Sequence, residues 1–397
     1  MKPGTMPSFM LIAGEPSGDL IAAELVAALK QELAGHPQSA ARAPQFFGAG
    51  GAKMVGVGVE LAFDMTEHAV VGIVEVLKNY GKFKQLFDQL ITLALDRRPD
   101  VIVCVDFSGF NRRFVRKLRW ELEVRRATHG NWRPKIVQYV SPQVWASRPG
   151  RANAMERDFD LVLAIFPFEK AWYARRVPEM RVEFVGNPAV DRFSPRPSTF
   201  NLQPSTNSVL LLPGSRVGEL RRHLPAMLDA LKIIRDAVPE IRARMVLPSA
   251  SLLQLARSFG RPPQLDVQIG NLHTALAEAT VAIASTGTVT MECAYFGVPT
   301  VAMYKTSWST YQIGKRIITV KHLAMPNILA DEALFPEFIQ DDATPENLAR
   351  AALELLNDPP RREAIRIQLA RVVESLGGPG VSRRAAQAVM NLVSPAR

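Results

Sequence analysis

The sequence predicts an α/β protein built from two doubly wound parallel sheets. Short runs of β-branched and apolar residues alternate along the chain with longer segments of helical periodicity. This alternation occurs twice, and each series opens with a strand followed by a glycine-containing turn. A segment rich in Pro, Ser and Asn separates the two series. We therefore expect an N-terminal domain at residues 1–190, a linker at 191–207 and a second domain at 208–376.

The first series begins with a strand at residues 8–13, the turn Gly14-Glu15-Pro16-Ser17-Gly18-Asp19 and a helix with apolar residues at helical spacing. The further strands expected in this domain are residues 45–48, 101–105, 135–140, 161–165 and 181–185.

The second series begins with a strand at 208–212 and the turn Pro213-Gly214-Ser215-Arg216, followed by a helix at 224–237. Its other expected strands are residues 244–247, 266–269, 281–284 and 300–303. A glycine-rich break precedes a separate C-terminal segment, 377–397, whose helix packs back on the N-terminal domain or on a second subunit. The sequence leaves monomer and homodimer open.

Composition indicates a globular, cytoplasmic protein. The 397 residues are 47% hydrophobic and 22% charged, and the net charge of +10 points to anionic partners. Cys104 and Cys293 both lie in apolar stretches, which is typical of a reducing compartment and not of a disulfide framework. No apolar run approaches the ~20 residues of a membrane span. Nucleic acid is a poor candidate partner because the basic residues are scattered and no recognition motif accompanies them.

Ligands of doubly wound sheets bind at the carboxyl ends of the strands, and two facing sheets would place the active site in the cleft between them. The turn that follows the first strand could bind an anion through its backbone N–H groups, or could be glycine-rich for steric reasons alone. Its candidate residues are Gly14, Ser17, Gly18 and Asp19.

Two further segments end strands of the first domain. Asp106 follows the strand at 101–105 and could serve as a general base, or it could cap the helix that follows. Ser141 and Trp145 follow the strand at 135–140. The indole of Trp145 could form a platform for a sugar or acyl chain, although a buried loop anchor is the simpler interpretation.

In the second domain, Gly214, Ser215 and Arg216 could bind a diphosphate through N–H groups and a bidentate guanidinium. Thr286, Gly287 and Thr288 form a small-residue turn between a strand and a helix and could also donate to phosphate. Glu292, about one helical turn later, could accept both hydroxyls of a ribose. This strand–turn–helix segment is typical of nucleotide-sugar enzymes.

The basic segment 112–126 is predicted to be an amphipathic helix. Such a helix can lie on an anionic membrane, or it can simply pack its apolar stripe on the sheet.

The six histidines are dispersed without metal-ligand spacing, so no metal site is expected. No phosphate-binding Walker loop and no dinucleotide fingerprint occur, and no cofactor is expected.

Taken together and in order, these segments resemble the lipid-A-disaccharide synthases, glycosyltransferases of bacterial lipid A synthesis. The matching stretches cover roughly residues 8–355. They are AGEPSGD (13–19), VGIVEVL (71–77), YVSPQVWA (139–146), FPFEK (166–170), LLPGSR (211–216), TGT (286–288) with EC (292–293), MPNILA (325–330) and PEFIQ (336–340).

The resemblance implies a GT-B fold, with two Rossmann-like domains facing across a cleft, and no metal requirement. It implies inverting transfer of 2,3-diacylglucosamine from its UDP derivative to 2,3-diacylglucosamine 1-phosphate, giving a β-1,6-linked disaccharide 1-phosphate. Asp106 matches the family's candidate base, and Arg216, Glu292, Asn327 and Gln340 match donor-site positions. Because both lipid substrate and product are amphiphiles, we expect a peripheral protein on the inner face of the inner membrane of a Gram-negative-type bacterium.

Three positions depart from the family pattern. Gly109 stands where the family usually has Asp, Ser147 where it has Trp, and Asn187 where it has His. An amide can still form hydrogen bonds but cannot relay a proton. These differences leave open another inverting UDP-sugar transferase, an epimerase, or a catalytically silent nucleotide-sugar or lipid-binding protein.

Overall fold

The computed structural model describes residues 6–34, 43–66, 80–125, 130, 132–193, 207–260, 262 and 264–393. Three expectations lie outside them: the motif at 71–77, Arg126 at the end of the basic segment, and most of the linker. The chain divides into two compact units. Unit 1 comprises Met1–Asp191 with Leu376–Arg397, and unit 2 comprises Arg192–Ser375.

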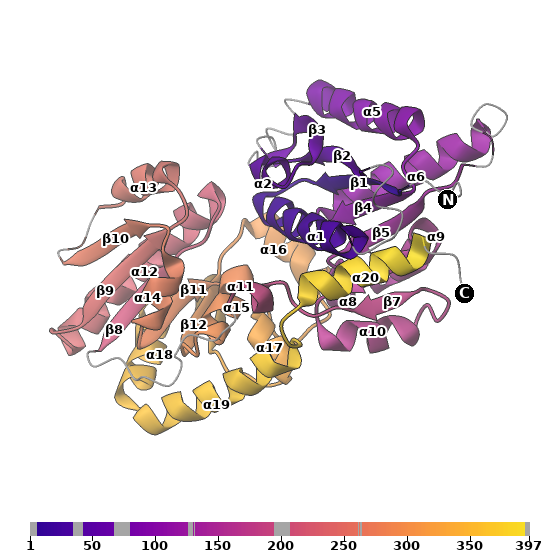
Figure 1. Cartoon of the computed structure of the whole chain (residues 1–397). Coiled ribbons are helices and arrows are strands. Elements are labelled where there is room, and N and C mark those ends of the chain that lie inside the picture. Colours follow the sequence, from indigo (N-terminus) through magenta and orange to yellow (C-terminus); the bar gives the residue numbers. More distant parts are fainter. Residues whose placement is uncertain are drawn as a thin grey trace. The chain divides into compact units, whose positions relative to one another are not determined.

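Unit 1 contains a seven-stranded parallel sheet in the order β3-β2-β1-β4-β5-β6-β7 (Figure 1). Its strands are β1 (Ser8–Ala13), β2 (Gln45–Gly50), β3 (Glu60–Asp64), β4 (Val101–Val105), β5 (Lys135–Tyr139), β6 (Leu161–Ala164) and β7 (Val182–Phe184). Its helices are α1 (Pro16–Ala34), α2 (Ala52–Gly56), α5 (Tyr80–Arg97), α6 (Ser108–Val124), α8 (Val144–Ser147), α9 (Ala152–Asp158), α10 (Pro167–Ala174), α11 (Ala189–Arg192, at the boundary) and α20 (Val381–Val393).

Burial on both faces explains why the central strands are continuous apolar runs. All five residues of β4, Val-Ile-Val-Cys-Val, are buried, as expected for a strand with helices on both sides. One side of the sheet forms a core with Phe114, Leu118 and Tyr173.

The C-terminal helix α20 belongs to unit 1 and lies alongside α1, yellow beside indigo in Figure 1. Its first turn is capped from elsewhere in the chain. The Asp191 carboxylate accepts the N–H groups of Gly380, Val381 and Ser382 at 2.6, 3.1 and 3.0 Å. Arg384 donates its Nε–H to the Val185 carbonyl at 2.9 Å. A carboxylate at a helix N-terminus satisfies orphan N–H groups and the helix dipole, so this contact holds the chain end on unit 1.

Unit 2 contains a six-stranded parallel sheet in the order β10-β9-β8-β11-β12-β13. Its strands are β8 (Ser208–Leu212), β9 (Arg242–Leu247), β10 (Leu265–Ile269), β11 (Val281–Ser285), β12 (Thr300–Tyr304) and β13 (Glu337–Ile339). Its helices are α12 (Val217–Ala237), α13 (Ala250–Arg257), α14 (Leu272–Ala277), α15 (Thr288–Tyr295), α16 (Trp308–Ile317), α17 (Met325–Ala330), α18 (Pro345–Asn357) and α19 (Pro359–Ser375).

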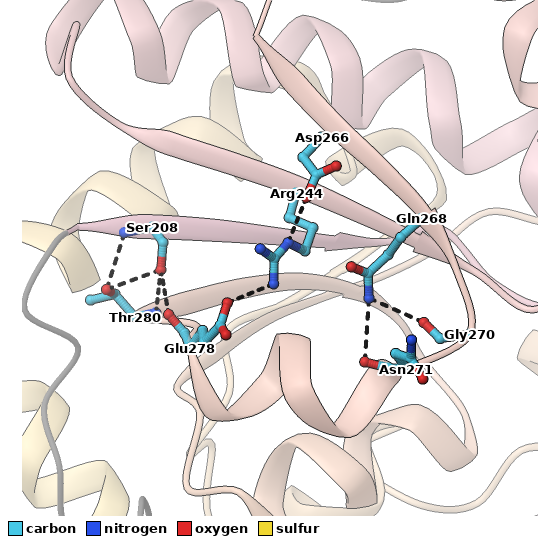
Figure 2. Close-up of polar contacts among 8 residues, drawn as sticks. All are labelled: Ser208, Arg244, Asp266, Gln268, Gly270, Asn271, Glu278 and Thr280. Atoms are coloured by element: carbon cyan, nitrogen blue, oxygen red, sulfur yellow. Dashed lines mark hydrogen bonds and ion pairs between the residues drawn. The ribbon is translucent and has the colours of Figure 1, made fainter.

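Polar side chains tie neighbouring strands of unit 2 together (Figure 2). Arg244 on β9 pairs with Asp266 of β10 at 2.9 Å and with Glu278, just before β11, at 2.7 Å. At the start of β8, the Ser208 N–H donates to Thr280 Oγ1 at 3.1 Å, and the Thr280 N–H donates to Ser208 Oγ at 3.0 Å. These contacts bridge β8, β9, β10 and the entry to β11.

The structure confirms the expected alternation of strands and helices in both units and adds three features. The short strands β3 and β13 at sheet edges are not predicted by the sequence. Helix α12 begins at Val217, well before the expected residue 224, because Pro225 lies inside the helix instead of near its start.

Candidate functional site

Two of the candidate segments of unit 1, the turn Gly14–Asp19 and Asp106, lie where the strand order of its sheet reverses. Strand β1 pairs with β2 on one side and with β4 on the other, so the chain order reverses between β1 and β4. The segments that follow these two strands therefore lie side by side at the carboxyl edge. A Cβ built on Gly18 would lie 3.8 Å from Cβ of Asp106, and one built on Gly14 would collide with the Phe107 ring. Glycine at position 14 therefore lets the turn approach the Asp106 segment, whereas a Cβ at position 18 would make ordinary van der Waals contact.

Asp106 lies in a strained turn that buried amides hold in place. Asp106 and Phe107 have φ values of 48° and 41°, in the left-handed region that a Phe rarely adopts. The Asp106 N–H donates to the Tyr139 carbonyl at 2.8 Å. Its own carbonyl accepts Nδ2–H of Asn111 at 2.8 Å and Nε2–H of Gln138 at 3.1 Å. The buried Asn111 and Gln138 side chains thus fix the backbone that carries the candidate base.

Asp19 is buried, and its carboxylate has protein partners. It accepts the N–H groups of Gly51, Lys53 and Met54 at 2.8, 2.9 and 3.1 Å. These donors belong to the start of α2, so Asp19 joins α1 to the segment after β2. Ser17, in contrast, is exposed in the first turn of α1.

The loop after β5 is anchored by a buried carboxylate that the sequence analysis did not single out. Glu169 on α10 accepts the indole N–H of Trp145 at 3.0 Å and the backbone N–H groups of Ile165 and Phe166 at 3.1 and 3.0 Å. Burial raises the pKa of Glu169 to about 7, although these hydrogen bonds act to lower it. Trp145 itself is buried, with its ring edge-on to Phe168 at 4.8 Å.

Two other candidates of unit 1 are also held by the protein. The Ser141 hydroxyl donates to the Tyr173 hydroxyl at 3.1 Å. Asn187 donates its backbone N–H to the Leu376 carbonyl at 3.0 Å, and its Oδ1 accepts the Ala189 N–H at 3.0 Å. Asn187 therefore shapes the start of α11 and joins it to the segment that leads into α20.

Unit 2 repeats the arrangement of unit 1. Strand β8 pairs with β9 and β11, so the chain order reverses between β8 and β11, with Leu212 opposite Ala284. The turns Pro213–Arg216 and Thr286–Thr288 follow these adjacent strands directly. The two candidate phosphate-binding turns therefore share one edge of one sheet.

The first of these turns carries an exposed guanidinium. Gly214 has φ 117°, and the Glu219 carboxylate accepts the Ser215 N–H at 3.1 Å. The Arg216 side chain is 71% exposed, and its one ionic contact among the described residues is to Glu219 at 3.5 Å. Because this surface contact costs little to exchange, Arg216 is available to an anionic ligand.

The second turn leads into α15. Gly287 has φ 148°, and its carbonyl accepts both the N–H and the hydroxyl of Thr290, at 3.1 and 2.7 Å. The first turn of α15 thus presents the N–H end of a helix at the sheet edge, which favours a negatively charged group.

Glu292 lies on α15 among aromatic side chains. Burial raises its pKa to about 7, against the opposing charge of Arg192. Its Oε2 lies 3.8 Å from Nε2 of His273, and burial lowers the pKa of His273. The His273 ring stacks on Phe296 at 5.7 Å and meets Phe193 edge-on at 4.6 Å.

His273 was not singled out by the sequence, since nothing in its spacing links it to Glu292. Its loop is held by Gln268, which donates Nε2–H to the carbonyls of Gly270 and Asn271 at 3.1 and 3.3 Å (Figure 2). Gly270 and Asn271 have φ values of 70° and 50°, so the chain turns sharply into α14, which carries His273.

Asn327 and Gln340 hold loops of unit 2 together at the two ends of the short strand β13. Asn327 is buried. It donates to the Phe335 carbonyl and to Glu337 Oε1, both at 2.8 Å, and accepts the Phe335 N–H at 2.8 Å. Gln340 accepts the Thr306 N–H at 2.6 Å and donates to the Thr306 carbonyl at 3.2 Å. The Gln340 side chain thus fixes the segment that follows β12, and the Asn327 side chain fixes the segment between α17 and β13.

The basic segment forms α6, which packs Phe114, Val115 and Leu118 into the core. Several of its cations are paired within the protein. Lys117 and Arg125 both contact the buried Glu121, at 2.9 and 2.8 Å, and Arg119 contacts Asp160 at 2.9 Å. Trp120 and Val124 are exposed at 51% and 60%.

Two features are absent from the described part of the chain. The helices there are too short or too polar to span a bilayer. No group of three or more His, Cys, Asp or Glu side chains there is arranged to hold a metal ion.

Comparison with known proteins extends the resemblance over the whole chain. Residues 9–392 match the family model described as lipid-A-disaccharide synthetase. A lipid-A-disaccharide synthase of Geobacter metallireducens is 39% identical over 99% of this chain and 100% of its own length.

Solved structures show the fold alone. The UDP-GlcNAc 2-epimerase of Neisseria meningitidis, bound to UDP-GlcNAc, aligns with a TM-score of 0.59 at 10% identity, over 97% of this chain and 100% of its own. The calicheamicin glycosyltransferase aligns with a TM-score of 0.57 at 14% identity, over all of both chains. Both units thus follow the GT-B pattern shared by glycosyltransferases and epimerases. By its full-length family match, the chain belongs to the lipid-A-disaccharide synthases and is a hexosyltransferase.

Proposed function

We propose that the protein transfers 2,3-diacylglucosamine from UDP-2,3-diacylglucosamine to the 6-hydroxyl of 2,3-diacylglucosamine 1-phosphate. The acceptor oxygen attacks C1 of the donor sugar, the bond from C1 to the UDP oxygen breaks, and C1 inverts to the β configuration. The observation that carries this proposal is that the candidate turn of α1 and Asp106 in unit 1, and the two candidate phosphate-binding turns in unit 2, lie where the strand order of each sheet reverses.

The donor is assigned to unit 2. Arg216 and the N–H end of α15, with Thr286, Gly287 and Thr288, offset the charge that develops on the departing UDP. Glu292 accepts the hydroxyl groups of the ribose. Gly214 and Ser215 shape the first turn, while Asn327 and Gln340 act through the loops they hold.

The acceptor is assigned to unit 1. Asp106 takes the proton of the attacking hydroxyl, and the strained turn around it fixes the position of its carboxylate. The first turn of α1, with Gly14, Ser17 and Gly18, faces the acceptor phosphate. Asp19, Ser141, Trp145 and Asn187 support the surrounding loops, as their protein partners indicate.

Because donor and acceptor are both amphiphiles, we infer that the protein acts at the cytoplasmic surface of the inner membrane. The exposed Trp120 and Val124 on α6, next to cationic side chains, support a peripheral contact there.

The test is product formation from purified protein and both substrates in detergent micelles, with and without a chelator. Mass spectrometry should detect a tetra-acyl disaccharide 1-phosphate, and UDP release should require the acceptor. Conversion of the donor without acceptor would indicate an epimerase. UDP binding without any product, across several acyl lengths, would indicate a binding protein.

A further inference from the structure

Helix α16 of unit 2 carries apolar side chains that the unit does not bury. None of its ten residues is buried. Trp308 and Ile313 are exposed at 74% and 58%, and Ile318, directly after the helix, at 41%. A single exposed apolar residue is ordinary, whereas two on one short helix and a third directly after it expose enough apolar surface to suggest a partner. A helix this short is also marginal in water without packing.

The chain segment that contains α16 carries charge of one sign. Between residues 305 and 330 the sequence contains Lys305, Lys315, Arg316 and Lys321 but no Asp or Glu. Lys321 has only a 3.9 Å contact to Asp331, with both side chains more than 80% exposed. Among the described residues, no acidic side chain pairs with Lys315 or Arg316. The basic segment of helix α6 differs, because Lys117, Arg119 and Arg125 form ion pairs with acidic side chains.

The two cations and the two exposed apolar side chains lie within one half of the circumference of α16. Trp308 and Ile313 are five residues and therefore about 140° apart, with polar residues between them. Arg316 lies three residues after Ile313, and Lys315 lies seven residues, two turns, after Trp308. A helix with Trp and Ile flanked by Lys and Arg suits the boundary between lipid headgroups and acyl chains.

We propose that α16, with Ile318 and Lys321, is a surface by which unit 2 contacts an anionic phospholipid bilayer. The cations meet the headgroups, and Trp308, Ile313 and Ile318 insert beside them. This surface contains no residue of α6 and none of the residues assigned to the UDP-sugar, although α16 begins two residues after Thr306, which Gln340 holds. The proposal therefore stands or fails independently of the reaction proposed above.

The test measures flotation of the full chain with two kinds of vesicle: phosphatidylcholine alone, and phosphatidylcholine with about a third phosphatidylglycerol. Each cation near an anionic surface contributes roughly fivefold to binding. Lys315→Gln with Arg316→Gln should therefore weaken binding to the anionic vesicles by roughly 30-fold. Trp308→Ser with Ile313→Ser should lower it by at least as much, because two inserted side chains are lost.

Matched controls keep the result specific. Arg257→Gln on α13 and Ile367→Ser on α19 alter an exposed cation and an exposed apolar residue elsewhere in unit 2 and should leave flotation unchanged. UDP affinity by calorimetry should be unchanged in every variant, which separates lost lipid binding from misfolding and from failure of the proposed reaction.

Three outcomes would overturn the proposal. The first is wild-type flotation by both α16 double variants. The second is loss of flotation only in a Trp120→Ser, Val124→Ser variant, which would assign the contact to α6. The third is a wild-type dimer in light scattering that Ile313→Ser converts to monomer without changing flotation, which would assign the patch to a second copy of the chain.

Discussion

Replacing Glu169 by Gln should change how the stability of the protein depends on pH. The carboxyl is buried on α10, and its folded-state pKa of about 7 lies above the ordinary value of 4.5. Between these two values the folded protein holds a proton that the unfolded chain has lost. Stability contributed by this group is therefore present at low pH and falls as pH rises toward 7. The Gln side chain has the same size and does not titrate.

The size of the effect follows from the two pKa values. Between pH 5 and pH 8 the wild-type protein should lose roughly 2–3 kcal/mol relative to Glu169→Gln. Unit 1 has about 200 residues, for which 1 kcal/mol shifts Tm by roughly 2–4 °C. The Tm of the variant, relative to wild type, should thus rise by roughly 4–12 °C between pH 5 and pH 8. Glu169→Ala removes the acceptor of three N–H donors and should cost roughly 3–6 kcal/mol at either pH.

The assay is thermal unfolding of wild type, Glu169→Gln and a control, Glu183→Gln, across this pH range. Glu183 pairs with Arg181 at the surface of the same unit, and its replacement should give a curve parallel to wild type. Parallel curves for Glu169→Gln as well would refute the reasoning. They would mean that the N–H groups of Trp145, Ile165 and Phe166 outweigh the cost of burying the charge.

Four further results are expected. Asp106→Asn should lower kcat about 10²–10⁴-fold with little change in UDP affinity, because Asn also tolerates the left-handed turn. Asp64→Asn at the end of β3 is the control, and undiminished turnover in Asp106→Asn would remove Asp106 from the mechanism. Arg216→Ala should weaken UDP binding by calorimetry roughly 10- to 100-fold, whereas the exposed Arg222→Ala should not. Uridine affinity should rise as much as about tenfold from pH 6 to pH 8 while Glu292 ionises, and Glu292→Gln should remove that dependence; a flat wild-type profile contradicts it. Gly109→Asp meets open space in the first turn of α6 and should raise Tm by roughly 1–4 °C without lowering kcat; a lower Tm would show that the position cannot take a carboxylate.

The sequence predicts the central strands of both sheets but misses one edge strand of each, β3 and β13. The strand expected at residues 101–105 is β4 as observed, because a strand buried on both faces must be a continuous apolar run. Strand β3 has an exposed residue at its start and only half-buried ones at its end, and β13 is three residues long. Edge strands of this kind carry too little apolar signal to be told from loops.

The pairs of side chains that define the sites are less predictable than the strands. Glu169 and Trp145 are 24 positions apart, and His273 and Glu292 are 19 apart, with no motif that links either pair. Their proximity results from helices of different βα repeats that pack at one edge of a sheet. The raised pKa values of Glu169 and Glu292 likewise come from burial, and the burial of a Glu side chain cannot be predicted from its residue type.

The position of a polar side chain after a strand also does not show whether the side chain binds a ligand or forms hydrogen bonds within the protein. Asp19 and Asp106 follow adjacent strands of unit 1, and Asn327 and Arg216 both come from family motifs. The sequence therefore predicts a ligand contact equally well for both members of each pair. The structure distinguishes these residues by the groups that their side chains contact. Asp19 and Asn327 are buried with their hydrogen bonds supplied by backbone groups of neighbouring loops, so moving either toward a ligand would leave several buried groups unpaired. Arg216 would give up only an exposed surface contact. This difference in cost is why we place Arg216 against the substrate and assign Asp19 and Asn327 to holding the site in shape.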